Sequence, residues 1–109
     1  MKKTNITHNS GKRKSAVARA TMKENGTGRI YINNKLLEVY YSSKLYRDKV
    51  LEPIYLLGFE TVDKYDIFIK VQGGGISGQS EAIRVAISKC ISKFVANTKE
   101  KLFEYELLK

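Results

Sequence analysis

Apolar and polar residues alternate along two stretches of the chain, which is the spacing of a β-strand with one buried face. In residues 15–23 the predicted buried face of the strand consists of Ala16, Ala18, Ala20 and Met22. In residues 65–71 it holds Tyr65, Ile67, Ile69 and Val71. Residues 29–33 and 36–39 have the character of shorter strands, each preceded by a turn. The strands before residue 40 are therefore predicted to form a short antiparallel meander.

Apolar residues recur at helical spacing towards the C-terminus, at Ala82, Ile83, Ala86, Ile87, Cys90, Ile91, Phe94 and Val95. This spacing predicts an amphipathic helix from about residue 79 to 96, with a last helix through Leu107. Ser42-Ser43 can cap a helix over residues 44–51. Pro53 is expected to end that helix and to begin a short second one closed by Gly58.

These elements predict an α+β fold in which a mostly antiparallel sheet is backed by helices on one face. Residues 1–11 are polar and are expected to form an arm, and residues 12–109 a single domain. Because 42% of the residues are apolar, the chain is expected to fold rather than to remain disordered.

A glycine-rich stretch, residues 72–79 (QGGGISGQ), joins the strand at 65–71 to the long helix. Glycine permits positive φ and a close approach to the backbone, and a helix N-terminus offers N–H groups to an anion. Gly73, Gly75 and Gly78 satisfy the dinucleotide-binding spacing, but no second parallel strand is predicted after the helix. A Walker loop is excluded because no Lys-Ser or Lys-Thr pair follows the glycines.

The net charge of the chain indicates which class of molecule carries the anion expected at the glycine-rich stretch. Against 11 Asp and Glu, the 20 Lys and Arg give a formal net charge of +9, which favours a polyanionic partner. Residues 1–23 contain no acid and include the run Lys12-Arg13-Lys14 followed by Arg19. The polyanionic partner is either nucleic acid or an anionic membrane surface. No membrane-spanning segment is expected, because no apolar run approaches the roughly 20 residues that span a bilayer.

The sequence offers few groups of residues that could serve catalysis or bind a metal. The single histidine, His8, lies in the polar N-terminal stretch, and no Cys/His cluster has metal-ligand spacing. Cys90 falls on the apolar side of its helix and is expected to be a buried thiol. We therefore expect neither an enzyme nor a bound cofactor.

Several of these segments together resemble the small-subunit ribosomal protein nine family. They are residues 11–19 (GKRKSAVAR), Glu52-Pro53, the strand at Asp66-Ile67 and residues 72–84 (QGGGISGQSEAIR). The resemblance covers residues 9–107, the glycine stretch is highly specific, and the spelling is closer to the archaeal and eukaryotic branch.

The resemblance implies a two-layer α/β sandwich with a four-stranded sheet and a left-handed βαβ crossover, as in domain two of small-subunit ribosomal protein five. It implies a place in the head of the cytoplasmic small ribosomal subunit, bound to rRNA and neighbouring head proteins. The family's basic C-terminal tail, which reaches tRNA, is absent, because the chain stops at Lys109 where that tail would start. The tRNA contact is therefore expected on none of these residues.

The leading hypothesis is a structural rRNA-binding protein, with phosphates bound by Lys12, Arg13, Lys14 and Arg19. The backbone at Gly73, Gly74, Gly75 and Gly78 would admit the RNA, and Gln72, Gln79 and Arg84 would bond around it. A bulkier residue at Gly74 is expected to impair RNA binding and leave the fold intact.

Two alternatives stay open at this point. The first is a small phosphotransferase, because some small-molecule kinases share the fold of ribosomal protein five and hold nucleotide phosphates on a glycine-rich loop. A free-standing RNA-binding protein outside the ribosome is the other.

Overall fold

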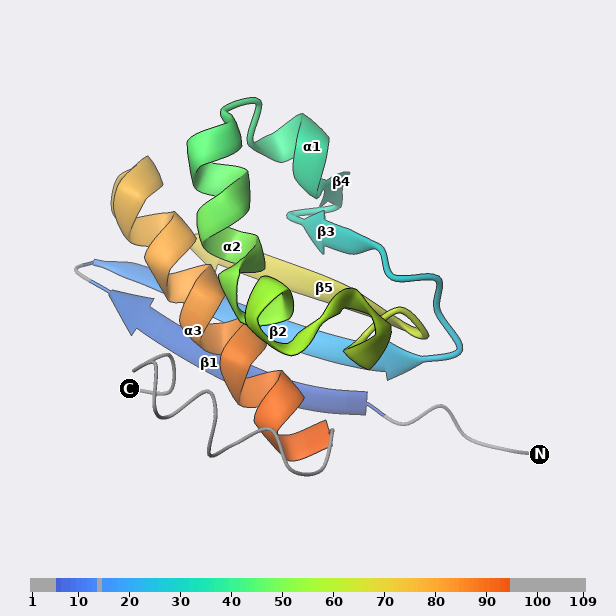
Figure 1. The fold of residues 1–109 in the computed structure, drawn as a ribbon. Coiled ribbons are helices and arrows are strands. Elements are labelled where there is room, and N and C mark those ends of the chain that lie inside the picture. Colours follow the sequence, from blue (N-terminus) through green and yellow to red (C-terminus); the bar gives the residue numbers. More distant parts are fainter. Residues whose placement is uncertain (1–5, 14, 95–109) are drawn as a thin grey trace.

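A computed structural model describes residues 6–13 and 15–94, with side chains from residue 15 to 93. The strands are β1 (Ile6–Arg13), β2 (Ala16–Glu24), β3 (Ile30–Ile32), β4 (Lys35–Leu36) and β5 (Tyr65–Gln72) (Figure 1). The helices are α1 (Leu37–Tyr40), α2 (Lys44–Leu57), the 3-10 helix η1 (Phe59–Thr61) and α3 (Ile76–Phe94). The predicted last helix and Lys14 lie outside the described residues.

The strands form one sheet of five in the order β1-β2-β5-β3-β4, antiparallel except where β3 runs parallel to β5. The predicted α+β class, a mostly antiparallel sheet backed by helices, is confirmed. The sheet has more strands than the four expected, because residues 6–13 pair with β2 throughout instead of forming an arm. The chain between β3 and the parallel strand β5 passes through α1, α2 and η1, and the handedness of this crossover stays a prediction.

The predicted meander is wrong, because β3 does not pair with β2. The loop after β2 instead bonds the start of β5: Gly26 N–H donates to the Lys64 carbonyl at 2.8 Å and Gly28 N–H to the Tyr65 carbonyl at 2.9 Å. One carboxylate oxygen of Asp66 accepts from the N–H groups of Thr27 and Arg29. These bonds carry the chain past β5, so that β3 adds to its far edge.

Two other boundaries differ from the prediction. Asn33 and Asn34 both have positive φ, as a two-residue hairpin turn requires, but β4 lasts only two residues before α1 begins. Pro53 lies inside a continuous α2 instead of dividing it. A proline inside a helix costs about 3 kcal/mol, and the burial of Val50, Pro53 and Ile54 against the core offsets this cost.

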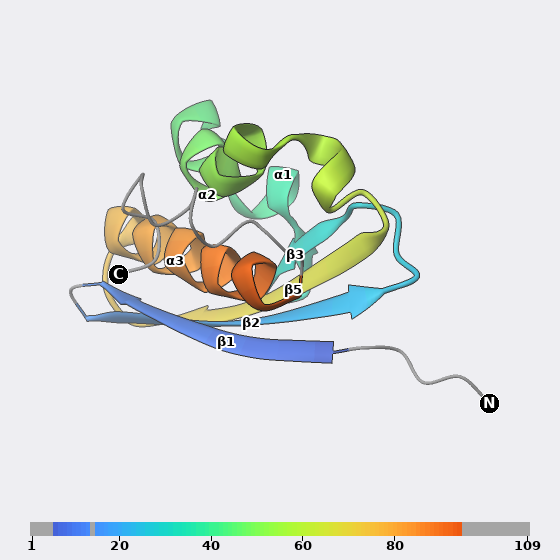
Figure 2. The same ribbon diagram turned by 60° about the horizontal axis from the view of Figure 1, so that its bottom comes forward.

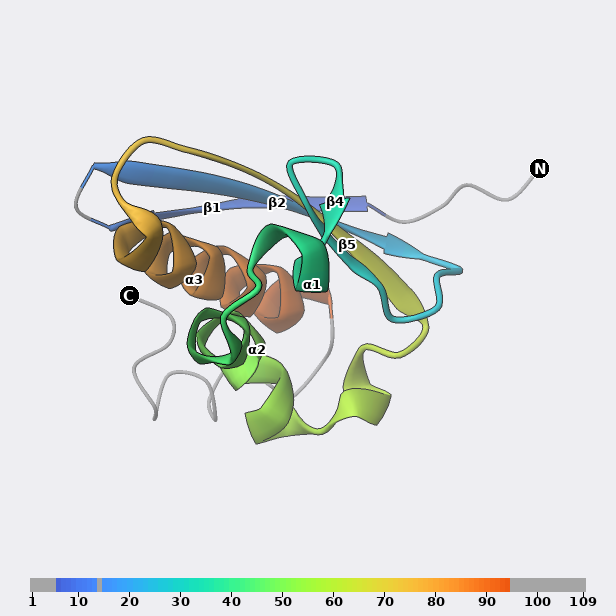
Figure 3. The ribbon, with the colours of Figure 1, turned by 90° about the horizontal axis from the view of Figure 1, so that it is seen from above.

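All the helices lie on one face of the sheet (Figure 2), and α3 lies between the sheet and α2 (Figure 3). The alternating alanines explain how α3 packs there. Ala16, Ala18 and Ala20 are fully buried, as are Ala82, Ala86 and Cys90 of α3. Small side chains on both elements allow the helix axis to lie close to β2. The opposite face of the sheet, from which Val17, Arg19, Thr21 and Lys23 project, carries no helix within residues 6–13 and 15–94. We call it the open face.

Candidate nucleic-acid interface

The glycine loop meets the turn between β1 and β2, so the two motifs singled out in the sequence lie together. Gly73 and Gly74 have φ of +79° and +64°, a region that favours glycine. A Cβ on Gly73 would clash with the Ser15 carbonyl oxygen, and one on Gly74 would lie 2.9 Å from the Ala16 Cβ. These two glycines are therefore required by the fold itself.

Gly75 differs from its neighbours. A Cβ built on it would meet nothing within 4 Å, and its φ is not positive. Gln79 N–H donates to the Gly75 carbonyl at 2.9 Å, which places Gly75 at the N-terminal boundary of α3. The first N–H groups of a helix have no partner within it and carry partial positive charge. The absent side chain at Gly75 thus leaves this end of α3 open to an anion.

Three polar side chains hold the loop in place. The Asn33 side-chain amide donates to the Val71 carbonyl at 3.2 Å and accepts from Val71 N–H at 3.0 Å, which continues the hydrogen bonding of β5 past the end of β3. Tyr40 Oη donates to Gln79 Oε1 at 3.0 Å, and Gln79 Nε2 donates to the Gly73 carbonyl at 3.3 Å. Gln79 therefore binds the loop to α1 and is not a free group at the surface.

Next to the loop, the open face has a hollow of about 290 Å³ lined by Val17, Arg19, Asn33, Lys70, Val71 and Gln72. Arg19 is paired directly with Lys70 across β2 and β5, and Val17 with Gln72. Directly opposed residues of neighbouring strands project from the same face. Two exposed cations therefore stand side by side in the hollow, and Gln72 connects it to Gly73.

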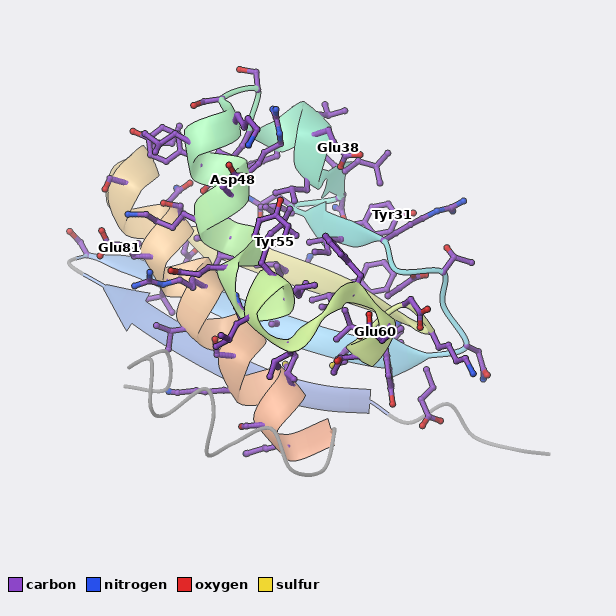
Figure 4. The ribbon with its side chains drawn as sticks, in the orientation of Figure 1. Tyr31, Glu38, Asp48, Tyr55, Glu60 and Glu81 are labelled. Atoms are coloured by element: carbon purple, nitrogen blue, oxygen red, sulfur yellow. The ribbon has the colours of Figure 1, made fainter. Side chains whose placement is uncertain are left out.

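The three ion pairs among the described side chains lie on α2 and α3, on the other side of the molecule. They are Lys44–Asp48 at 2.6 Å, Lys49–Glu81 at 3.8 Å and Arg84–Glu52 at 2.6 Å. Figure 4 shows Asp48 and Glu81 on this helical layer. Arg19, Lys23 and Lys70 belong to none of these pairs. On the open face, Lys23 is opposite Asp66 in the strand register, whereas Arg19 and Lys70 are opposite each other and not opposite a carboxylate.

Shifted pKa values also belong to the helical side. The hydrogen bond between Lys44 and Asp48 raises the pKa of the lysine and lowers that of the carboxyl. Burial raises the pKa of the Tyr41 phenol, whose hydroxyl has no hydrogen-bond partner among the described residues.

The structure brings together part of the predicted site. Arg19, Gln72, Gly73, Gly74 and Gly75 are adjacent, and all are exposed. Along β1, the register pairs Lys12 with Val17 and Arg13 with Ala16, which places both positions beside the loop. Lys14 lies outside the described residues.

The other predicted residues are engaged within the protein. Gly78 is buried in the first turn of α3. The Arg84 guanidinium bonds Glu52 of α2, away from the open face.

Sequence reasoning missed Lys70 and Asn33. A signal for Lys70 was present, because it alternates with the buried positions Ile69 and Val71 and must project opposite to them. Asn33 had no such signal, since its bond to Val71 depends on β3 lying beside β5.

No three His, Cys, Asp or Glu side chains gather as metal ligands would within the described part of the chain. Nor does any helix in that part have the length and apolar character needed to cross a membrane.

The described residues define a small α+β domain in which a glycine-rich loop at a helix N-terminus lies beside a basic sheet surface. Residues 11–109 match the model of a family described as "Ribosomal protein S9/S16". The chain belongs to this ribosomal protein family, as the sequence resemblance predicted.

Curated relatives agree with the family. Over 83 residues, the chain is 47% identical to small ribosomal subunit protein uS9 of Rickettsia typhi and of Rickettsia prowazekii. Its identity to the protein of that name from Rickettsia canadensis is 46%. These matches cover 76% of this chain and 50% of each relative. The chain thus spans about half the length of the curated relatives it matches.

The loop geometry predicts different costs for the same substitution at two glycines. Gly73→Ala should lower the free energy of unfolding by about 1–3 kcal/mol, because the left-handed conformation and the Ser15 carbonyl both oppose a Cβ. Gly75→Ala should cost less than about 1 kcal/mol, the cost of a poorer N-cap. Urea denaturation followed by circular dichroism measures both. Equal losses would show that the loop is not held against the turn as described.

Proposed function

We propose that the chain is a structural, non-enzymatic constituent of the small ribosomal subunit and binds rRNA through the open face and the glycine loop. The observation that supports this most directly is the pairing of Arg19 with Lys70 beside the open end of α3. Like charges directly opposite each other destabilise a sheet. A polyanion in the hollow removes that penalty, and membership of a ribosomal protein family makes rRNA the expected polyanion.

Phosphate contacts account for the arrangement. The exposed guanidinium of Arg19 and ammonium of Lys70 neutralise phosphates of one RNA strand, and the N–H groups at the start of α3 donate to a further phosphate beside Gly75. Lys12 and Arg13, whose positions in β1 are opposite Val17 and Ala16, and Lys14, which follows them in the sequence, are the further phosphate-binding residues of this proposal. Such contacts position the protein on RNA without reading a sequence.

The remaining residues of the sequence hypothesis have supporting roles in this proposal. Gln79 and Gly78 fix the loop on α3, and Arg84 joins α3 to α2. Gln72 hydrogen-bonds the RNA from the edge of the hollow. The Gly74 substitution suggested by sequence is a poor probe of RNA binding, because a side chain there also disturbs Ala16. Gly75 is the better position.

The finer assignments come from the family resemblance. They are a place in the head of a cytoplasmic small subunit, contacts with neighbouring head proteins, and kinship with the archaeal and eukaryotic branch. The family's tRNA contact belongs to a basic tail and is assigned to none of residues 1–109.

A phosphotransferase is disfavoured by the chemistry of the hollow. The described residues that line it carry cations, amides and aliphatic groups but no carboxylate to hold a metal or accept a proton. Saturable ATP binding in calorimetry at physiological salt would revive this alternative.

Co-sedimentation tests the proposed function. The tagged chain, expressed in cells, should migrate with small ribosomal subunits on a sucrose gradient and remain there at moderate salt. Release of the chain to the top of the gradient, together with retention of a known subunit protein, would support a free-standing RNA-binding protein instead.

A matched pair of substitutions at Gly75 tests the loop. Asn and Asp are both favourable helix N-caps, so neither variant should destabilise the protein. Gly75→Asp also sets a negative charge beside the bound phosphate, and it should weaken RNA affinity by about 5- to 30-fold more than Gly75→Asn, on the order of 1–2 kcal/mol of repulsion. Fluorescence anisotropy with labelled rRNA fragments measures the difference. Identical affinities for the two variants would remove the loop from the interface.

Lys70→Gln should change binding and stability in opposite directions. It should reduce the slope of log affinity against log salt by about 0.7–0.9, the value for one phosphate. Because it also removes the repulsion from Arg19, the free energy of unfolding should stay equal or rise. Lys44→Gln, a control on the helical side where that side chain is 78% exposed, should leave the slope unchanged. Equal slopes for wild type and Lys70→Gln would contradict the phosphate contact.

A further inference from the structure

The open face carries an apolar row beyond the cationic hollow. Phe68 of β5 is paired with Thr21 on one side and with Tyr31 of β3 on the other, and Tyr31 is paired with Leu36 of β4. The Tyr31 and Phe68 rings stack with centroids 5.0 Å apart and planes within 5° (Figure 4 labels Tyr31). Both rings are half-buried, and Leu36 is 39% exposed.

These rings contribute nothing to the core, which lies on the other side of the sheet under α3. A stacked cross-strand pair stabilises a sheet by about 0.5–1.5 kcal/mol. That stabilisation alone would account for an isolated pair surrounded by neutral residues. The surroundings of this pair are different.

Cations border the aromatic pair. Lys23 Nζ lies over the Phe68 ring, 4.9 Å from its centroid, so Phe68 has Tyr31 on one side and Lys23 on the other. Lys70 is two residues from Phe68 on the same face of β5. The nearby carboxylate, Asp66, already accepts two backbone N–H groups. A protein partner with an apolar surface would have to bury Lys70, which is opposite Arg19 and not opposite a carboxylate, and this is costly. A ligand that combines flat rings with negative charge satisfies both features of this surface.

We propose that the row formed by Tyr31, Phe68 and Leu36 binds unpaired nucleotides of RNA, with a base against the side of the Tyr31 ring that Phe68 leaves uncovered and the flanking phosphates on Lys23, Lys70 and Arg19. Duplex RNA cannot use the rings, because its bases are stacked within the helix. Stacking on aromatic side chains is tolerant of sequence, so the row selects for single-stranded structure and not for particular bases. This inference rests on the proposed RNA-binding function and specifies the form of RNA that the open face takes.

Two RNAs and four variants of the full chain test it by fluorescence anisotropy. The probes are a short unstructured RNA and a fully paired hairpin, both labelled at one end. Tyr31→Leu and Phe68→Leu should each weaken binding of the unstructured RNA by about 5- to 150-fold and leave binding of the hairpin unchanged. Arg19→Gln should weaken both, and Tyr31→Phe, which keeps the stacking ring, should bind the unstructured RNA as the wild type does.

The outcomes separate the two proposals. If Arg19→Gln weakens binding while both leucine variants bind the unstructured RNA as the wild type does, the base-binding row is wrong and the proposed function stands. Equal losses on both RNAs in the leucine variants also overturn the row. If the wild type binds neither RNA, the proposed function fails first. Thermal unfolding checks each variant, and if Phe68→Leu does not fold, Tyr31→Leu with its Tyr31→Phe control decides.

Discussion

The close passage of the Gly73 backbone over the Ser15 carbonyl is the constraint on which the rest of the interface depends. Only glycine combines the left-handed φ with the absence of a Cβ that this contact needs. Because the loop lies against the turn before β2, the first residues of α3 are held beside the start of β2. The bonds among Asn33, Tyr40 and Gln79 then tie the same loop to β5 and α1. The proposed anion site is thus held in place by one close backbone contact and by these side-chain hydrogen bonds.

Local patterns in the sequence predicted those strands and helices that bury one continuous apolar face. β2, β5 and α3 each have a continuous apolar face, and each was placed within a few residues of its bounds. The pairing of β3 was missed, because it depends on bonds between the 24–29 loop and β5 that no local pattern encodes. The continuity of α2 was missed for a related reason. Pro53 disfavours a helix locally, and only burial against the core compensates for it.

The residues of the candidate site could be predicted where residue type alone marks them. They could not be predicted where their role depends on which other side chains they contact in the fold. Runs of glycine and of Lys and Arg mark a loop and a basic surface without any knowledge of the fold. Whether an individual polar group is free is a tertiary question. Arg84 has the charge expected of an RNA contact, yet Glu52 holds its guanidinium at 2.6 Å. Lys70 looked like an ordinary solvated strand residue until the register set it opposite Arg19.

The arrangement of charged residues also favours the open face as the proposed RNA-binding surface. On α2 and α3, Asp48, Glu52 and Glu81 are each within 4 Å of a cation, although Arg47, Lys89 and Lys93 of the same helices belong to none of these pairs. On the open face, Arg19 and Lys70 are direct neighbours across two strands, although a carboxylate at either position would stabilise the sheet. The sheet therefore bears a repulsive pair that its own side chains leave uncompensated. A bound polyanion converts this repulsion into attraction for both cations at once, so the arrangement that weakens the free domain strengthens its complex.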